Sequence, residues 1–172
     1  MACNSTIFLF LVAVFLGLLA FASGDAALIN NVCGKTANPG SCHKCFNEYT
    51  RSSGEDVKAL GRTSIDCASS QSLNVMSDVG NHVATATNKE KEAYVDCSLK
   101  LQTGDQKIAS ALQSWQTGHY VDAGNLLLDA LQAARDCSAG LQKFNPPPSV
   151  GDGLTTLQGF CEAANGVLRQ IH

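Results

Sequence analysis

The sequence predicts an all-α protein: an up-down-up-down four-helix bundle that follows an N-terminal α-helical hairpin and is stapled by disulfides. No proline occurs between Pro39 and Pro146, and such a run suits long helices better than a turn-rich β-sandwich. Apolar side chains also recur at steps of three and four along four segments joined by short connections. We interpret these stripes as core, since they contain no cofactor motif.

Residues 1–24 are expected to be a signal peptide. The stretch from Ile7 to Ala22 is almost wholly apolar, and no charged residue precedes Asp25. Its small residues near position 24 suit a signal peptidase, and it is short for a membrane span. We therefore expect residues 25–172 to form one secreted domain that has no membrane contact after cleavage.

Residues 25–50 are expected to form the hairpin from two short helices. The turn signal Asn38-Pro39-Gly40 separates them, and either Asn38 or Ser41 is a suitable cap for the second. A bridge from Cys33 to Cys42 would close a small loop and stabilise it by roughly 3 kcal/mol. The segment has little core of its own, so it must dock on the bundle or depend on that bond.

Residues 53–172 are expected to form the bundle, with Ser53 as the N-cap of its first helix. The triple proline Pro146-Pro147-Pro148 should end the third helix, because proline cannot continue a helix. The four helices are predicted at about 55–86, 89–116, 120–144 and from Gly153 onward.

Two cysteines lie almost symmetrically about one predicted turn. Cys97 precedes Gly118 by 21 residues, and Cys137 follows it by 19. Antiparallel helices that fold back at Gly118 would bring the two thiols level. A bridge between them would close a loop of about 40 residues and stabilise the fold by roughly 4 kcal/mol.

The remaining cysteines leave one pairing open. A third bridge from Cys45 to Cys67 would fasten the hairpin to the first bundle helix, and Cys161 would then stay a buried free thiol. Cys42 and Cys45 form a CxxC, but no second CxxC or His pair follows at zinc-finger spacing. We expect no metal site.

Composition and motifs argue against several functions. The net charge is −3 with acids and bases interspersed, unlike the basic surface of a nucleic-acid-binding protein. No GxSxG or HExxH motif is present, and we expect His43, His82 and His119 to lie on the surface. We therefore expect neither catalysis nor a cofactor. A small-ligand carrier is a remote alternative, although the packed stripes leave no obvious cavity.

Several local motifs together resemble the plant invertase and pectin methylesterase inhibitor family over essentially the whole mature length. The family's first four cysteines pair in order, which agrees with the two bridges expected from Cys33 to Cys42 and from Cys97 to Cys137, and its fifth resembles Cys161. The matching motifs are Ile29-Asn30-Asn31-Val32-Cys33-Gly34-Lys35-Thr36, Asn38-Pro39-Gly40-Ser41-Cys42, Leu60-Gly61-Arg62-Thr63-Ser64-Ile65-Asp66, Tyr94-Val95-Asp96-Cys97, Gly118-His119-Tyr120 and Cys137.

The resemblance implies a monomeric cell-wall (apoplast) or vacuolar protein that blocks the cleft of one carbohydrate-active enzyme in a one-to-one complex. Invertase inhibitors of the family often carry Asp-Pro-Lys-Phe between the second and third bundle helices, where this chain has Gly118-His119-Tyr120-Val121. This difference favours pectin methylesterase as the target. Asp129 and Gln132 stand where the methylesterase branch often has a small residue and a Thr, so acid invertase stays the alternative.

The target-binding residues are expected near the end where the second and third bundle helices meet. Tyr120 is the preferred anchor, because aromatic residues are often interface hot spots, although it could instead pack at the helix start. His119 would make binding pH-dependent, or would be a solvated turn residue. The candidates are Gln113, Gln116, Thr117, His119, Tyr120 and Asp122.

Overall fold

The structure, a computed structural model, describes residues 26–49 and 56–172. The expected signal peptide and Ser53 lie outside these ranges. Within them every regular element is helical, which confirms the predicted fold class, and none of these helices combines the length and apolarity needed to span a bilayer. The elements are a helical segment at 26–33, α2 (Pro39–Tyr49), α3 (Val57–Thr85), α4 (Asn88–Gln116), α5 (Tyr120–Leu141), the 3₁₀ turn η1 (Gln142–Phe144) and α6 (Pro148–Leu168).

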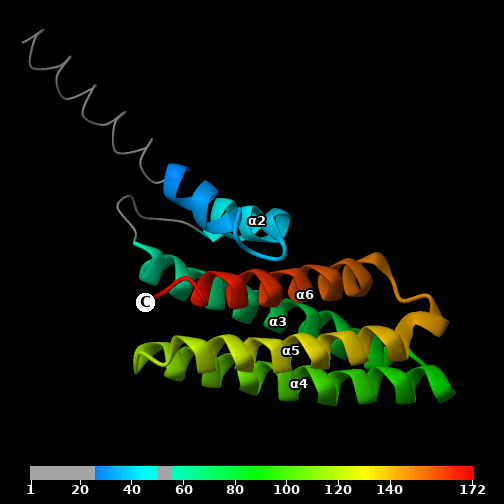
Figure 1. The fold of residues 1–172 in the computed structure, drawn as a ribbon. Helices are drawn as coiled ribbons and strands as arrows, with labels where there is room; N and C mark the ends of the chain where they lie inside the picture. Colours follow the sequence, from blue (N-terminus) through cyan, green and yellow to red (C-terminus); the bar gives the residue numbers. More distant parts are fainter. Residues whose placement is uncertain (1–25, 50–55) are drawn as a thin grey trace, which may run out of the picture.

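The four long helices pack as two layers around one core. Figure 1 shows α3 and α6 in one layer and α4 and α5 in the other, with the hairpin on the outside of the first layer. The predicted apolar stripes meet at the centre, where Ile65, Leu101, Leu127 and Leu154 are at most 1% exposed. Short connections between successive helices make the bundle run up, down, up and down.

Helix ends differ from the prediction at three places. The first bundle helix is capped by Asp56, whose carboxylate accepts a hydrogen bond from the Ala59 N–H at 2.7 Å. The third becomes a 3₁₀ turn after Leu141 and stops at Asn145, which is left-handed with φ 49°. The fourth begins at Pro148 instead of near Gly153, because proline suits the first helical turn, where its missing N–H is not needed.

Three disulfides tie these elements together. Cys33 is joined to Cys42 within the hairpin and Cys97 to Cys137 across α4 and α5, with Cα–Cα distances of 5.5 and 4.4 Å. The pairing left open by the sequence is formed, since a third bridge joins Cys45 of α2 to Cys67 of α3 with its Cα atoms 5.8 Å apart. Cys161 is buried on α6 and free.

The hairpin docks on α6 because α6 offers glycines where the hairpin approaches. A Cβ atom placed on Gly159 would overlap the side chain of Ser41, and one placed on Gly166 would lie 2.9 Å from the Thr36 side chain. Both contacts exclude any larger residue without movement. The hairpin therefore depends on a narrow glycine-lined strip of α6 as well as on its disulfides.

Replacing Gly159 by valine is expected to displace the hairpin from α6. The added side chain would collide with Ser41, and such overpacking typically costs about 1–3 kcal/mol. Hydrogen exchange of the amides in residues 26–49 should become faster, while the amides of α4 and α5 keep their protection.

Gly151 provides the matched control, because it lies on the same helix and a Cβ atom there would meet nothing within 4 Å. Gly151→Val should leave exchange in the hairpin unchanged. Equal protection of the hairpin amides in Gly159→Val and the wild type would show that close approach at Gly159 does not hold the hairpin.

Candidate functional site

The connection between α4 and α5 is a tight turn. α4 ends at Gln116 and α5 begins at Tyr120, and Gly118 adopts φ 82°, which glycine tolerates best. The Thr117 hydroxyl and His119 Nδ1 are hydrogen-bonded at 3.0 Å across it. The connection is therefore too short to project a loop away from the end of the bundle.

The structure gathers the predicted target-binding residues around this turn. All of them are exposed except Tyr120, which is half-buried. The ammonium of Lys58 on α3 lies 5.8 Å from the centre of the Tyr120 ring and 5.9 Å from that of Trp115. The indole N–H of Trp115 also donates to the Lys58 carbonyl oxygen at 3.2 Å. Part of the Tyr120 ring is therefore used in packing at the helix start.

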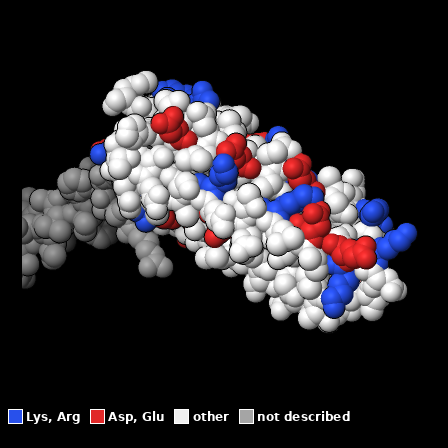
Figure 2. All heavy atoms as spheres, turned by 90° about the horizontal axis from the view of Figure 1, so that it is seen from below, with Lys and Arg blue, Asp and Glu red and all other residues white. Residues whose placement is uncertain are grey.

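The outward side of α4 leads from this turn and is uncharged. We call it the α4 face, and it comprises every exposed position of α4 from Leu99 to its end: Leu99, Gln102, Thr103, Gln106, Ala109, Gln113 and Gln116. Two half-buried lysines lie beside it. Lys100 is ion-paired with Asp96, and Lys107 is ion-paired with Asp129 at 3.0 Å. Figure 2, seen from the side of α4 and α5, shows charges of both signs interspersed with uncharged surface.

An apolar groove continues the α4 face toward the start of the helix. Val95 and Leu99 are 40% and 59% exposed, and they line a depression of about 560 Å³ together with Asn88, Lys91, Glu92 and Asp96. Sequence reasoning missed this groove. The signal was present, because Val95 and Leu99 are apolar and four residues apart yet lie off the buried stripe of Tyr94, Cys97 and Leu101.

The described residues offer no candidate for catalysis or metal binding. Burial, with a smaller contribution from Glu162, raises the pKa of the Cys161 thiol to about 12, so it stays protonated and is a poor nucleophile. In the ranges 26–49 and 56–172, no three His, Cys, Asp or Glu side chains are grouped as metal ligands would be. Two histidines expected on the surface, His43 and His82, are half-buried. His82 stacks on Tyr94 with 5.4 Å between ring centres.

The fold defines the class of the molecule: a helical-bundle protein stapled by disulfides. The family model for plant invertase/pectin methylesterase inhibitors matches residues 27–167, and the chain belongs to this family. Membership of an inhibitor family agrees with the expectation that the protein is not an enzyme.

Individual relatives extend this comparison. The chain is 28% identical over 154 residues to a pectinesterase inhibitor of Actinidia deliciosa. The aligned region covers 86% of this chain and 82% of that protein. A mutant form of a pectin methylesterase inhibitor from Arabidopsis has a similar structure, with a TM-score of 0.74 and 19% identity over 84% of this chain and 97% of that one. A pectin methylesterase inhibitor of Arabidopsis thaliana gives a TM-score of 0.66, again at 19% identity, over 86% and 98% of the two chains. At this identity the two structures support the fold alone.

Proposed function

We propose that this protein is a secreted, monomeric inhibitor of a pectin methylesterase, which it blocks by occupying the substrate cleft in a one-to-one complex. Family membership and the relationship to a pectinesterase inhibitor over 86% of the chain support the class of target. Expected secretion to the cell wall, with the vacuole as the other destination, would place it with such an enzyme.

The observation that carries the choice of target is the tight turn beside an uncharged helix face. A turn of three residues between α4 and α5 cannot extend into a deep active site as a longer inhibitory loop would. The seven side chains of the α4 face, by contrast, carry no charge, and the centres of protein interfaces are depleted in charged residues. Among the described residues, the half-buried Asp105 on the same helix has no ion-pair partner. Methyl-esterified pectin is also uncharged at each ester, so a cleft that binds it suits such a face.

The proposed interface extends along α4 from the Val95–Leu99 groove to the turn. The 29 residues of α4 span roughly 43 Å, enough for a standard interface of about 800 Å² per partner. A rigid helix loses little conformational entropy on docking. The candidates Gln113, Gln116, Thr117, His119, Tyr120 and Asp122 would form the end of this interface, and Val95 and Leu99 its apolar anchors.

Acid invertase is the second candidate target, and one feature of α5 favours it. Asp129, where the methylesterase branch often has a small residue, is ion-paired with Lys107 at 3.0 Å. Gln132 donates to Asp136 at 2.7 Å. These side chains make the exposed side of α5 more polar than the resemblance to methylesterase inhibitors implies.

A paired titration tests the proposal. The oxidised protein, without residues 1–24, is titrated against a plant pectin methylesterase and against an acid invertase at mildly acidic pH. We expect stoichiometric loss of esterase activity and unchanged invertase activity. Loss of invertase activity alone would show that the protein is an invertase inhibitor instead. No loss in either assay would contradict an inhibitory function toward these two enzymes.

Replacing Leu99 by aspartate should then weaken esterase inhibition about 30-fold, because a buried interface hot spot contributes about 2 kcal/mol or more. Leu73→Asp is the matched control, since Leu73 on α3 is 56% exposed, compared with 59% for Leu99, and does not line the groove. Circular dichroism should be the same for both variants. Equal inhibition by the two variants would remove the groove from the interface.

A further inference from the structure

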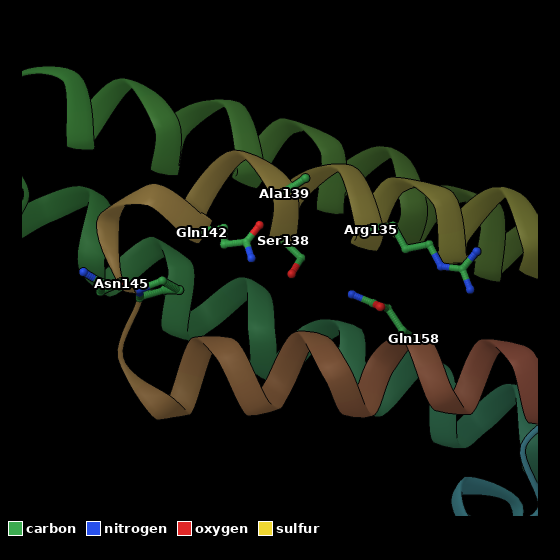
Figure 3. Close-up of a pocket in the computed structure, with 7 residues that line it drawn as sticks. Arg135, Ser138, Ala139, Gln142, Asn145 and Gln158 are labelled. Carbon is green, nitrogen blue, oxygen red and sulfur yellow. The ribbon is translucent and has the colours of Figure 1, made fainter.

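A polar trough lies between α5 and α6, and none of the residues that line it belongs to the proposed inhibitory interface. Its volume is about 550 Å³, within the range of about 300–1,000 Å³ that is usual for small-molecule sites. The short side chains of Ser138 and Ala139 leave this space beside α6. Polar side chains from α5, from the turn after it and from α6 surround the trough (Figure 3).

Four of these polar side chains have free hydrogen-bonding capacity. Ser138, Gln142, Asn145 and Gln158 make no side-chain hydrogen bond to any residue in the two described ranges. Figure 3 shows Ser138 and Gln142 on one wall and Gln158 on the other, with their polar ends in the space between the helices. Each amide offers both donors and an acceptor, so the trough can serve a ligand that carries many hydroxyl groups.

One end of the trough carries a guanidinium group that an ion pair holds in place. Arg135 donates through Nη2 to Glu162, and the other oxygen of that carboxylate accepts from Asn38 of the hairpin at 3.3 Å. The Nε–H and Nη1 groups of Arg135 make no hydrogen bond within the described part of the chain, and its side chain is 50% exposed. A guanidinium fixed in this way can bind a carboxylate through its free N–H groups.

We propose that this trough binds a short oligosaccharide that contains a uronic acid, with the carboxylate on Arg135 and sugar hydroxyls on Ser138, Gln142 and Gln158. From Arg135 to Asn145 the trough extends roughly 15 Å along the helix direction, which suits a chain of sugars better than a single one. The site requires no esterase, so it goes beyond the proposed function.

Other classes of ligand fit the lining less well. A peptide would need apolar anchor pockets or a free strand edge, and here the apolar lining comes only from Ala139 and Pro146. A nucleotide would find no aromatic side chain in the trough to stack on its base. The combination of amides, a hydroxyl and one guanidinium matches an acidic saccharide.

Nuclear magnetic resonance of the ¹⁵N-labelled, oxidised protein tests the proposal with trigalacturonate as the probe. We expect saturable shifts of the side-chain amides of Gln142, Asn145 and Gln158 and of the Arg135 Nε–H, with a Kd of about 1 mM, or about 4 kcal/mol. The neutral trisaccharide maltotriose should bind at least about tenfold more weakly, because a charged hydrogen bond is lost. Equal binding of the two saccharides would overturn the assignment of an acidic ligand.

Two substitutions locate the site. Arg135→Gln should weaken trigalacturonate binding about tenfold, since it removes the charge-assisted hydrogen bonds. Arg169→Gln is the matched control, because Arg169 directly follows α6 and lies outside the trough. Its Nε–H donates a hydrogen bond to Asn165 Oδ1. An equal loss in both variants would show unspecific attraction to positive charge and overturn the proposal.

A third variant, Gln142→Ala, tests the site without touching Glu162. It is needed because Arg135→Gln removes a partner of Glu162 and could thereby disturb the hairpin. The side chain of Gln142 is exposed and makes no hydrogen bond within the described residues, so its loss should leave the fold intact and weaken binding about threefold. Unchanged binding in this variant would contradict the site. Because no esterase is present in these measurements, a failure of esterase inhibition and a failure of saccharide binding are separate results.

Discussion

Replacing Cys97 and Cys137 together by alanine is expected to lower the free energy of unfolding by at least about 4 kcal/mol. The bridge joins α4 to α5 across 40 residues, and without it the unfolded chain gains conformational freedom. Total stability of a domain is only about 5–15 kcal/mol, so this loss is a large part of it. Urea unfolding should show the loss directly, and the melting temperature should fall by roughly 8–16 °C.

Cys161→Ala provides the control for lost packing. Like the bridged pair, Cys161 is almost fully buried, but it forms no cross-link, so removing its sulfur should cost only about 1 kcal/mol. The double variant must lose clearly more than twice that amount. A smaller loss would mean that the bridge adds nothing beyond the packing of its two sulfur atoms.

Phe160→Ala is expected to cost about 3–5 kcal/mol, the usual range for removing a buried aromatic side chain. Phe160 is 1% exposed on α6, the helix that contacts α2, α3 and α5. The ammonium of Lys44 on α2 lies 5.9 Å from its ring centre, so the ring also supports the docked hairpin. Denaturant unfolding measures the loss, and hydrogen exchange should show weaker protection at residues 39–49.

Phe144→Ala is the matched comparison, because this phenylalanine is only half-buried in the 3₁₀ turn. It should lose less than about 1.5 kcal/mol, in proportion to the smaller apolar area that it buries. If both phenylalanine variants unfolded at the same denaturant concentration, the central position assigned to Phe160 would be wrong.

The existence of the helices was predictable because their evidence is local. Leu127, Ala130 and Ala134 repeat at helical spacing, and all three are buried as expected. The helix ends were less predictable, because the same residue type, proline, can end one helix and begin the next. The triple proline predicts the end of the third helix, whereas Pro148 also begins the fourth.

The candidate surfaces were predictable from the sequence only where their residues are close together along the chain. The residues around Gly118 are close in sequence, so their gathering at one end of the bundle followed from a single turn. The Val95–Leu99 groove was not predictable with certainty, because exposure on α4 depends on which helices cover its other sides. The trough between Arg135 and Gln158 requires α5 and α6 to pack side by side, which no local pattern specifies.

The disulfide order has a consequence for how the chain could be made. The six bonded cysteines could pair in 15 ways, yet each is joined to its neighbour in order along the chain: Cys33 to Cys42, Cys45 to Cys67 and Cys97 to Cys137. A chain that meets an oxidising compartment from its N-terminus onward would therefore expose the correct partner before any competitor. At a synthesis rate of about 5–20 residues per second, the longest wait, across the 40 residues from Cys97, is roughly 2–8 s. Cys161 emerges last, when every earlier thiol can already be bonded, and the bundle then buries it.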